Sequence, residues 1–239
     1  MLSTLILFIL IIFFKIPSYI NVCGRRDPNL NECVANNVQN LRDKICRGLT
    51  EMNLPSIESL NIDKLVLSET ANNKIYLNNV QIIGLCDYIV NSVTIDIDKL
   101  NFIIDISFNQ LSVNGTYDID IHILVPIVYK APFYLTSDDV RIKGIIQAEL
   151  NTYKGKKHIF ISELKTYVDI KRYDVQYNLN ENEISQLGQI FEGLIGSNQE
   201  EFIQRLTPSL EKEVSNWLIQ IWNNLSKKYS YDQLFPNRT

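Results

Sequence analysis

The sequence predicts an α+β fold in which an antiparallel β-sheet curls around one long C-terminal helix. Between Ile57 and Leu179 most apolar residues recur at every second position, which is typical of strands with one buried face. Residues 197–229 instead carry apolar side chains at intervals of three and four, which is typical of an amphipathic helix. A sheet with one apolar face needs a cover, and this long helix is the natural one.

The N-terminus resembles a targeting segment. Leu5 to Phe14 is an unbroken apolar run of ten residues, followed by Lys15, Pro17 and Ser18. The run is too short to span a bilayer and matches the hydrophobic part of a secretory signal peptide. We therefore expect residues 1–18 to be removed and residues 19–239 to form a single secreted domain. The alternative is an uncleaved anchor, which the shortness of the run disfavours.

Composition and charge exclude some classes of partner. The 239 residues are 46% hydrophobic and 21% charged, which suits one ordinary domain or two small ones, and no linker divides them. The net charge is −4, and no block of lysines and arginines forms a basic patch. We therefore expect neither a nucleic-acid partner nor attachment to an anionic membrane.

The four cysteines predict disulfides in an exported protein. Cys23 and Cys33 flank a short polar loop, so we predict that they pair. Cys46 and Cys86 either form a second pair or are buried thiols, and the spacing leaves both alternatives open.

Three sequons, at Asn114, Asn224 and Asn237, are consistent with secretion. Asn114 falls in a predicted turn, so it is the predicted glycosylation site. Asn224 lies near the edge of the apolar stripe of the long helix, and we expect it to be poorly modified.

The elements follow one another in a simple order. Glu32 to Arg47 is predicted to be a short helix that covers the core and ends at Gly48. A sheet of seven to nine strands is expected next, with turns at Ser112–Gly115 and Tyr153–Gly155. Residues 184–195 are predicted to form a second short helix.

The long helix is expected to run from Ser197 to Tyr229. Ser197 and Glu200 have the spacing of a capping box. Pro208 is expected either to kink the helix or to restart it with Thr207 as a second N-cap. The apolar stripe includes Ile203, Leu206, Leu210, Val214, Trp217 and Ile221, whereas Ser215 and Asn223 are expected on the far side.

The chain lacks the residue patterns of an enzyme. His122 and His158 are the only histidines, and neither has a metal-binding partner at suitable spacing. We expect both to be solvated. The sequence contains no nucleophile elbow and no glycine-rich phosphate loop. We therefore predict no catalytic residue, no metal, no cofactor and no enzymatic activity.

The abundant inward-facing apolar residues favour a binding cavity, because a sheet curled around one helix leaves space at its ends. A solid core is the simpler interpretation for any single residue, but the architecture favours a cavity for the set. The predicted ligand-binding residues are Phe102, Ile104, Ile106, Phe108, Phe191, Leu194 and Trp217.

Residues 23–33 resemble the opening of the takeout and haemolymph juvenile-hormone-binding protein family of insects. That opening is a cysteine, an Asp-Pro-x-Leu-Asn sequence as at Asp27–Asn31, and a second cysteine. The resemblance continues to the Leu-Phe-Pro ending at Pro236. Between these ends it includes Gly48, Leu54–Ile57, Gly84-Leu85, Gly115-x-Tyr117, Leu124–Ile127, Leu187-Gly188, Asn198, Pro208 and Tyr231.

The resemblance implies a tubular lipid-binding fold, with a strongly curved sheet wrapped once around the long helix. It also implies a secreted monomer that carries a small hydrophobic ligand, such as a juvenile-hormone-like terpenoid or a fatty acid. Members are linked to hormone transport, circadian output, feeding and chemosensation. The alternative is a salivary, chemosensory or circadian-output protein with a filled or vestigial tunnel, acting through a receptor or other protein partner.

The chain departs from the family pattern where glycines are usual. Ile121, Tyr129 and Ala131 replace glycines, and Gly196 and Gln199 replace an asparagine and a tryptophan. We expect the bulky Ile121 and Tyr129 to narrow or reshape the tunnel.

Overall fold

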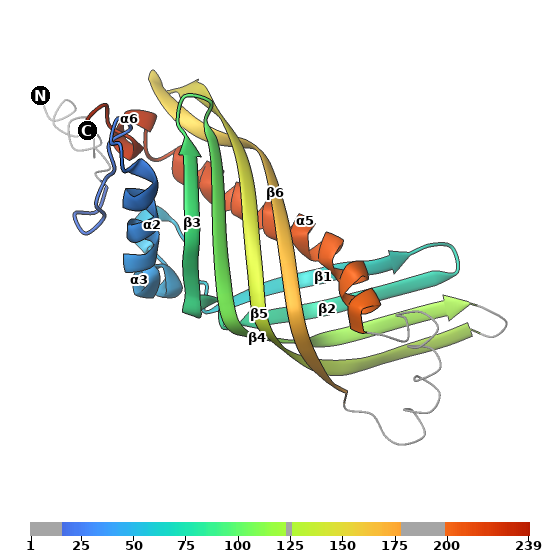
Figure 1. Cartoon of the computed structure of the whole chain (residues 1–239). Coiled ribbons are helices and arrows are strands. Elements are labelled where there is room, and N and C mark those ends of the chain that lie inside the picture. Colours follow the sequence, from blue (N-terminus) through green and yellow to red (C-terminus); the bar gives the residue numbers. More distant parts are fainter. Residues whose placement is uncertain (1–15, 123–125, 178–198) are drawn as a thin grey trace, which may run out of the picture.

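The computed structural model describes residues 16–122, 126–177 and 199–239. Six strands form one antiparallel sheet: β1 (Ser59–Glu69), β2 (Asn73–Ile83), β3 (Tyr88–Asp96), β4 (Asn101–His122), β5 (Pro126–Tyr153) and β6 (Lys156–Tyr177). The strand order is β1-β2-β4-β5-β6, and β3 also pairs with β4. The long helix α5 (Gln199–Ser226) lies along the open side of the curved sheet (Figure 1). The predicted fold class is confirmed.

Within the described residues, the strands are fewer and longer than the seven to nine expected. The turn predicted at Ser112–Gly115 was wrong, because these residues lie inside β4 and pair with residues 133–136 of β5. The turn at Tyr153–Gly155 was correct: Lys154 and Gly155 connect β5 to β6 with φ angles of 50° and 75°.

A change of side-chain alternation within β4 explains the error. Phe108 and Leu111 are both buried, although the exposed Asn109 and Gln110 lie between them. The alternation of the opposite strand, β5, changes phase at the same level, where Asp139 has a φ of 54°. A single long strand therefore has two phases of alternation and looks like two strands in the sequence.

The strand β4 also changes its pairing partner at this level. Residues 101–108 of β4 pair with β3, whereas residues 112–121 pair with β2. Gly84 lies between β2 and β3 with a φ of 99°, and a Cβ there would lie 2.6 Å from the carbonyl oxygen of Gln110. Glycine therefore permits the close approach at which the sheet bends into two arms (Figure 1).

Two helices replace the one predicted for residues 32–47. They are α2 (Leu30–Asn40) and α3 (Arg42–Arg47), and Gly48, with a φ of 85°, follows as expected. Side chains of α2 bind the free edge of β3. The backbone N–H of Val90 donates to Gln39 Oε1 at 3.0 Å, and that of Ile95 donates to Asn31 Oδ1 at 2.9 Å.

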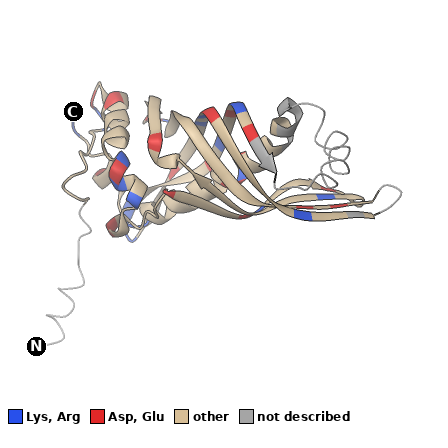
Figure 2. Cartoon of the chain, turned by 90° about the horizontal axis from the view of Figure 1, so that it is seen from below, with Lys and Arg blue, Asp and Glu red and all other residues tan. Residues whose placement is uncertain are grey.

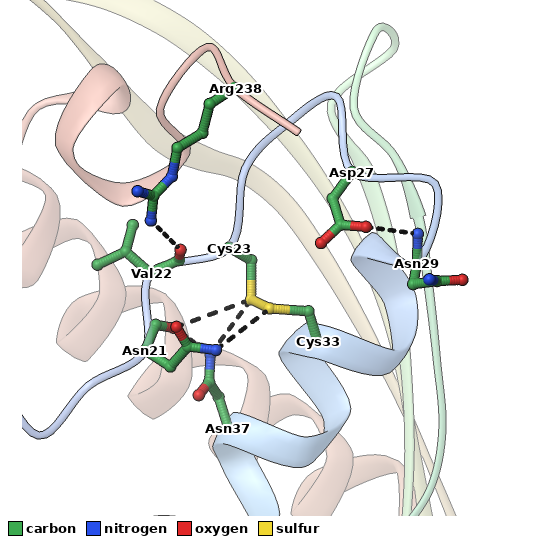
Figure 3. Close-up of a disulfide and its surroundings, with 8 residues drawn as sticks. All are labelled: Asn21, Val22, Cys23, Asp27, Asn29, Cys33, Asn37 and Arg238. Atoms are coloured by element: carbon green, nitrogen blue, oxygen red, sulfur yellow. Dashed lines mark hydrogen bonds between the residues drawn. A yellow bond between two sulfur atoms is a disulfide. The ribbon is translucent and has the colours of Figure 1, made fainter.

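Two disulfides hold this end of the molecule together. The predicted Cys23–Cys33 bond is confirmed and joins the N-terminal strap, residues 16–29, to α2 (Figure 3). Cys46 and Cys86 form a second bond, which links α3 to the short helix η2 (Leu85–Asp87). The guanidinium of Arg238 donates to the backbone oxygen of Val22 at 2.9 Å, so the C-terminal residues also bind the strap (Figure 3).

The helix α5 continues through Pro208 without a restart. The hydroxyl of Thr207 donates to the carbonyl of Ile203 at 2.7 Å, so it bonds back to the preceding turn and is not an N-cap. The short elements η1 (Thr50–Met52) and α6 (Tyr231–Leu234) pack near the C-terminal end of α5. The predicted capping box at Ser197 and the helix predicted for residues 184–195 lie outside the described residues.

Candidate functional site

A cavity of about 360 Å³ lies between the inner face of the sheet and α5. This volume falls within the usual range for small-molecule pockets, about 300–1,000 Å³. Every strand of the sheet contributes to its wall, and Val38 of α2 and Ile45 of α3 contribute at one end. Buried residues from β1, β2, β4 and β5 form much of the sheet wall, among them Leu65, Leu77, Leu111, Leu135 and Val140.

One face of α5 forms the opposite wall. Leu206, Leu210, Val214, Trp217 and Ile221 follow one another at intervals of three or four residues and all line the cavity. Residues at this spacing lie on one side of a helix. The apolar stripe read from the sequence is therefore a cavity wall as well as a packing surface.

Two polar side chains of the wall, those of Tyr88 and Ser137, donate their hydroxyl hydrogens to backbone oxygens. The hydroxyl of Tyr88 donates to the backbone oxygen of Val38 at 2.7 Å, and burial raises the pKa of Tyr88 to about 12, which keeps the phenol neutral. The hydroxyl of Ser137 donates to the backbone oxygen of Arg172 at 2.9 Å. The wall therefore presents an almost entirely apolar surface to a ligand.

Polar side chains of α5 position the helix against β6, which is an edge strand of the sheet. The backbone N–H of Ile161 donates to Asn223 Oδ1 at 2.9 Å, and Asn223 Nδ2 donates back to the Ile161 oxygen at 3.2 Å. The backbone N–H of Val168 donates to Glu211 Oε1 at 2.8 Å. The helix thus satisfies backbone groups that a further strand would otherwise bind.

Three expectations for polar residues near this contact were wrong. Ser215 is buried and shares a 2.7 Å hydrogen bond with Thr166, and Asn223 binds β6, so neither lies on a far side. His158 is 5% exposed, and its Nδ1 lies 2.6 Å from the backbone oxygen of Ser226. The errors share a cause, because α5 and β6 pack against each other through faces that were expected to meet solvent.

The same helix binds the other edge of the sheet. The hydroxyl of Ser209 donates to the backbone oxygen of Val66 in β1. Since β1 and β6 are the two ends of the strand order, α5 bridges these two edges and closes the cavity on its open side.

The structure brings some of the predicted ligand-binding residues together. Ile106, Phe108 and Trp217 line the cavity. Phe102 packs instead in a second cluster, where its ring centre lies 6.1 Å from that of Phe235. Ile104 is half-buried and lies outside the described wall, and Phe191 and Leu194 fall outside the described residues.

The sequence analysis missed the contribution of β2. Leu77, Val80 and Ile82 of this strand line the cavity, yet none was nominated. A bulge between Asn78 and Gln81 interrupts the alternation after Leu77, and Asn79 has a φ of 51°. The alternation from Ile75 to Leu77 was the available signal, but it spans too few residues to predict a strand.

Two bulky replacements of family glycines lie in the same core as the cavity wall. Ile121 is fully buried, and Tyr129 stacks on Tyr117 with ring centres 5.8 Å apart. Tyr117 lines the cavity, so this stack supports one part of its wall.

The sequons occupy different settings from those expected. Asn114 lies within β4, and its amide donates to Gln81 Oε1 at 3.2 Å. Asn224 is exposed rather than close to a buried edge. Glycosylation of Asn114 stays a prediction, without the turn on which it was based.

Within the described ranges, no group of three or more His, Cys, Asp or Glu side chains is arranged to hold a metal ion. In those same ranges no helix combines the length and apolar character needed to cross a membrane. Figure 2 shows basic and acidic residues interspersed along the ribbon.

Comparison with known proteins gives one family match. The model of the family described as haemolymph juvenile hormone binding protein matches residues 2–236. None of the curated proteins compared with the chain matches it significantly.

Among solved structures, Takeout 1 of Epiphyas postvittana is similar with a TM-score of 0.70 and 16% identity. The match covers 90% of this chain and 98% of that one. Lipopolysaccharide binding protein gives a TM-score of 0.36 at 15% identity, covering 82% of this chain and 40% of that chain. Latherin gives 0.22 at 18% identity, covering 84% and 81%. The two lower scores carry no structural argument.

Proposed function

The chain belongs to the haemolymph juvenile hormone binding protein family, and on this premise we propose that it is an extracellular carrier of a small hydrophobic ligand. The ligand class that we propose is a juvenile-hormone-like terpenoid or a fatty acid. Two disulfides suit an oxidising, extracellular compartment. The leader at residues 1–18 is the segment that would direct export.

The observation that carries this proposal is the apolar cavity between the sheet and α5. Burial of apolar ligand surface is favourable by about 25 cal/mol per Å², which amounts to a few kcal/mol before the costs of association. We propose that Ile106, Phe108 and Trp217 contact the ligand, since all three belong to the wall.

The test is a fluorescence titration of delipidated protein with a labelled terpenoid and a labelled fatty acid. The chain contains two tryptophans, of which Trp217 lines the cavity, whereas the Trp222 indole donates to the backbone oxygen of Ile159 at 3.2 Å. We expect saturable quenching that survives Trp222→Phe and is largely lost in Trp217→Phe. An absence of saturable binding to either probe would overturn the carrier function.

Mass spectrometry of the secreted protein tests the proposed processing. Removal of residues 1–18 predicts a mature chain that begins at Tyr19, and occupancy of Asn114 adds the mass of a glycan. A secreted chain that still begins at Met1 would contradict the proposed cleavage.

A further inference from the structure

The sequon residue Asn114 lies on the outer face of the sheet. The preceding residue, Val113, lines the cavity, and successive side chains of a strand point to opposite faces. Asn114 therefore points away from the cavity. It pairs with Gln81 of β2 on one side and with Tyr134 of β5 on the other, so it has a neighbouring strand on each side.

Tyr134 places an aromatic ring beside Asn114 on this outer face. Directly opposed side chains of an antiparallel pair have Cβ atoms about 4.5–5.5 Å apart. The neighbours Phe133 and Leu135 are buried, whereas Tyr134 is 41% exposed. Its hydroxyl donates to Oγ of Ser112, two residues before Asn114, at 3.2 Å. This hydrogen bond holds the ring on the surface of the sheet next to Asn114.

The surface around Asn114 and Tyr134 is uncharged. The adjacent outward positions of β2, β4 and β5 include Gln81, Ile83, Ser112, Thr116, Pro132 and Thr136. Ile83 is 42% exposed, so the surface combines amides and hydroxyls with exposed apolar groups. A neutral partner with C–H groups on one face and hydroxyls at its rim fits such a surface, and a pyranose sugar has this character.

The sequon Asn114-Gly115-Thr116 provides a covalent attachment point for such a sugar. Attachment forms a bond from Asn114 Nδ2 to C1 of the sugar and breaks the bond from C1 to a lipid diphosphate donor. The diphosphate leaves with the electron pair, and one amide proton is released. The second amide hydrogen remains, so the donation from Asn114 to Gln81 Oε1 at 3.2 Å is compatible with the attached sugar.

We propose that the first N-acetylglucosamine of a glycan on Asn114 packs its C–H face on the ring of Tyr134. The inference rests on the proposed secretion and on the predicted glycosylation of Asn114, and it adds a docking site for the sugar. The contact covers an exposed ring and connects β4 with β5 from outside. The glycan therefore stabilises the folded protein.

A thermodynamic cycle on protein secreted from insect cells tests this contact. Thr116→Val removes the sequon but keeps a β-branched side chain in the strand, and Tyr134→Thr removes the ring. The glycan increment is the Tm of a glycosylated protein minus the Tm of its Thr116→Val counterpart. We expect this increment to be about 3 °C larger with Tyr134 than in the Tyr134→Thr background, as one aromatic contact gives in a chain of this length. The sequons at Asn224 and Asn237 stay intact in every variant, so their effects cancel.

Tyr167 provides the matched control, because it is a 50% exposed tyrosine of β6 that pairs with Lys143, in the other arm of the bent sheet. Tyr167→Thr is expected to leave the glycan increment unchanged. Tyr134→Phe keeps the ring and should retain the increment. Equal increments in the wild-type and Tyr134→Thr backgrounds would overturn the inference. Absence of a glycan on Asn114, detected as no loss of glycan mass in Thr116→Val, would also overturn it.

The carrier function is tested separately from this contact. Asn114 lies on the outer face, so Thr116→Val is expected to leave the quenching of Trp217 by a ligand unchanged. Failure of the glycan contact therefore leaves the carrier function standing, and an absence of saturable ligand binding leaves the glycan contact standing.

Nuclear magnetic resonance gives a second, independent test in protein that carries ¹³C-labelled N-acetylglucosamine. Sugar protons that lie over the face of an aromatic ring shift upfield because of its ring current. We expect such a shift for the Asn114-linked sugar in the wild type and in Tyr167→Thr, and its loss in Tyr134→Thr. An identical sugar spectrum in the wild type and in Tyr134→Thr would show that the sugar does not contact the ring.

Discussion

At the scale of single residues, Asn223 binds the edge of β6 through one donor and one acceptor, as a residue of a neighbouring strand would. Its amide group is bonded to both the N–H and the C=O of Ile161. A side chain in this position leaves two backbone groups without partners when it is removed, and such losses destabilise a protein more than the loss of a solvent-exposed contact.

Replacement of Asn223 by alanine is expected to lower the free energy of unfolding by about 1–3 kcal/mol, because Ile161 loses both partners. Urea unfolding monitored by circular dichroism measures the change. The adjacent Asn224 is exposed, so Asn224→Ala should change stability by less than about 0.5 kcal/mol. Equal effects of the two substitutions would show that the contact with β6 contributes little.

The ion pair of Asp105 makes the stability of the fold depend on pH. Hydrogen bonds from the Arg141 guanidinium, at 2.8 and 2.6 Å, lower the pKa of the buried Asp105 carboxyl, and Asn91 donates a further bond at 2.9 Å. A carboxyl with a lowered folded-state pKa stabilises the fold above its unfolded pKa, near 3.9. This stability is lost as the pH falls through the folded-state pKa.

We therefore expect Asp105→Asn to be less stable than the wild type at pH 7, with a difference that shrinks as the pH falls below about 4. Unfolding curves between pH 7 and pH 2.5 measure this convergence. The exposed ion pair of Asp139 and Arg172, at 2.8 Å, supplies the control, and Asp139→Asn should change stability by less than about 1 kcal/mol throughout. A constant Asp105→Asn difference over this range would contradict the argument.

At the scale of elements, the two disulfides close loops of different length. Cys46 and Cys86 are 40 residues apart, whereas Cys23 and Cys33 are 10 apart. Each bond limits the entropy of the unfolded chain. Its removal is therefore expected to lower the free energy of unfolding by about 4 kcal/mol for the longer loop and about 3 kcal/mol for the shorter one. The longer bond also joins α3, whose Ile45 lines the cavity, to η2 beside β3.

We expect removal of the longer bond, in Cys46→Ala/Cys86→Ala, to lower the free energy of unfolding more than removal of the shorter bond, in Cys23→Ala/Cys33→Ala. Guanidinium unfolding of the two variants beside the wild type measures both losses, and the difference between them should be about 1 kcal/mol. A greater loss for the Cys23–Cys33 variant would show that contacts of the N-terminal strap outweigh loop entropy.

The sequence predicted the elements whose pattern has one unbroken period. The stripe from Leu206 to Ile221 identified α5 and its buried face, because a helix keeps one phase of 3.6 residues throughout. It could not predict that β4 is one strand, because the alternation changes phase between Phe108 and Leu111. A change of phase and a break between strands look alike until the partner strand is known.

The cavity was less predictable than the fold. Ile106, Phe108 and Trp217 were recognised as inward-facing, but alternation alone did not separate them from Phe102, which packs in another cluster. The distinction depends on the position of the residue along a bent sheet, since Phe102 lies near the hairpin end of β4 and Phe108 lies at the bend. Tertiary geometry of this kind has no local signal in the sequence.

At the scale of the whole molecule, the cavity links ligand binding to global stability. Its walls come from the sheet and from α5, so unfolding destroys the site. A ligand present at 100 times its dissociation constant stabilises the folded state by about 2.7 kcal/mol. For a chain of 239 residues this corresponds to a rise in Tm of roughly 5–10 °C.

Differential scanning calorimetry with and without a bound fatty acid or terpenoid measures this rise. The Trp217→Phe variant should still show it, because loss of the reporter removes quenching and leaves most of the apolar wall. A ligand that quenches Trp217 without raising Tm would bind the unfolded chain as well as the folded one, in conflict with an internal site.

The bridge that α5 makes between β1 and β6 has a consequence for biosynthesis. The ribosome completes the six described strands at Tyr177, about 50 residues before Ser226 is added at the end of α5. At about 5–20 residues per second the nascent sheet waits roughly 3–10 s with both lateral edges unpaired. Unpaired edges are templates for intermolecular strand pairing, so this interval is when the polypeptide most needs a chaperone.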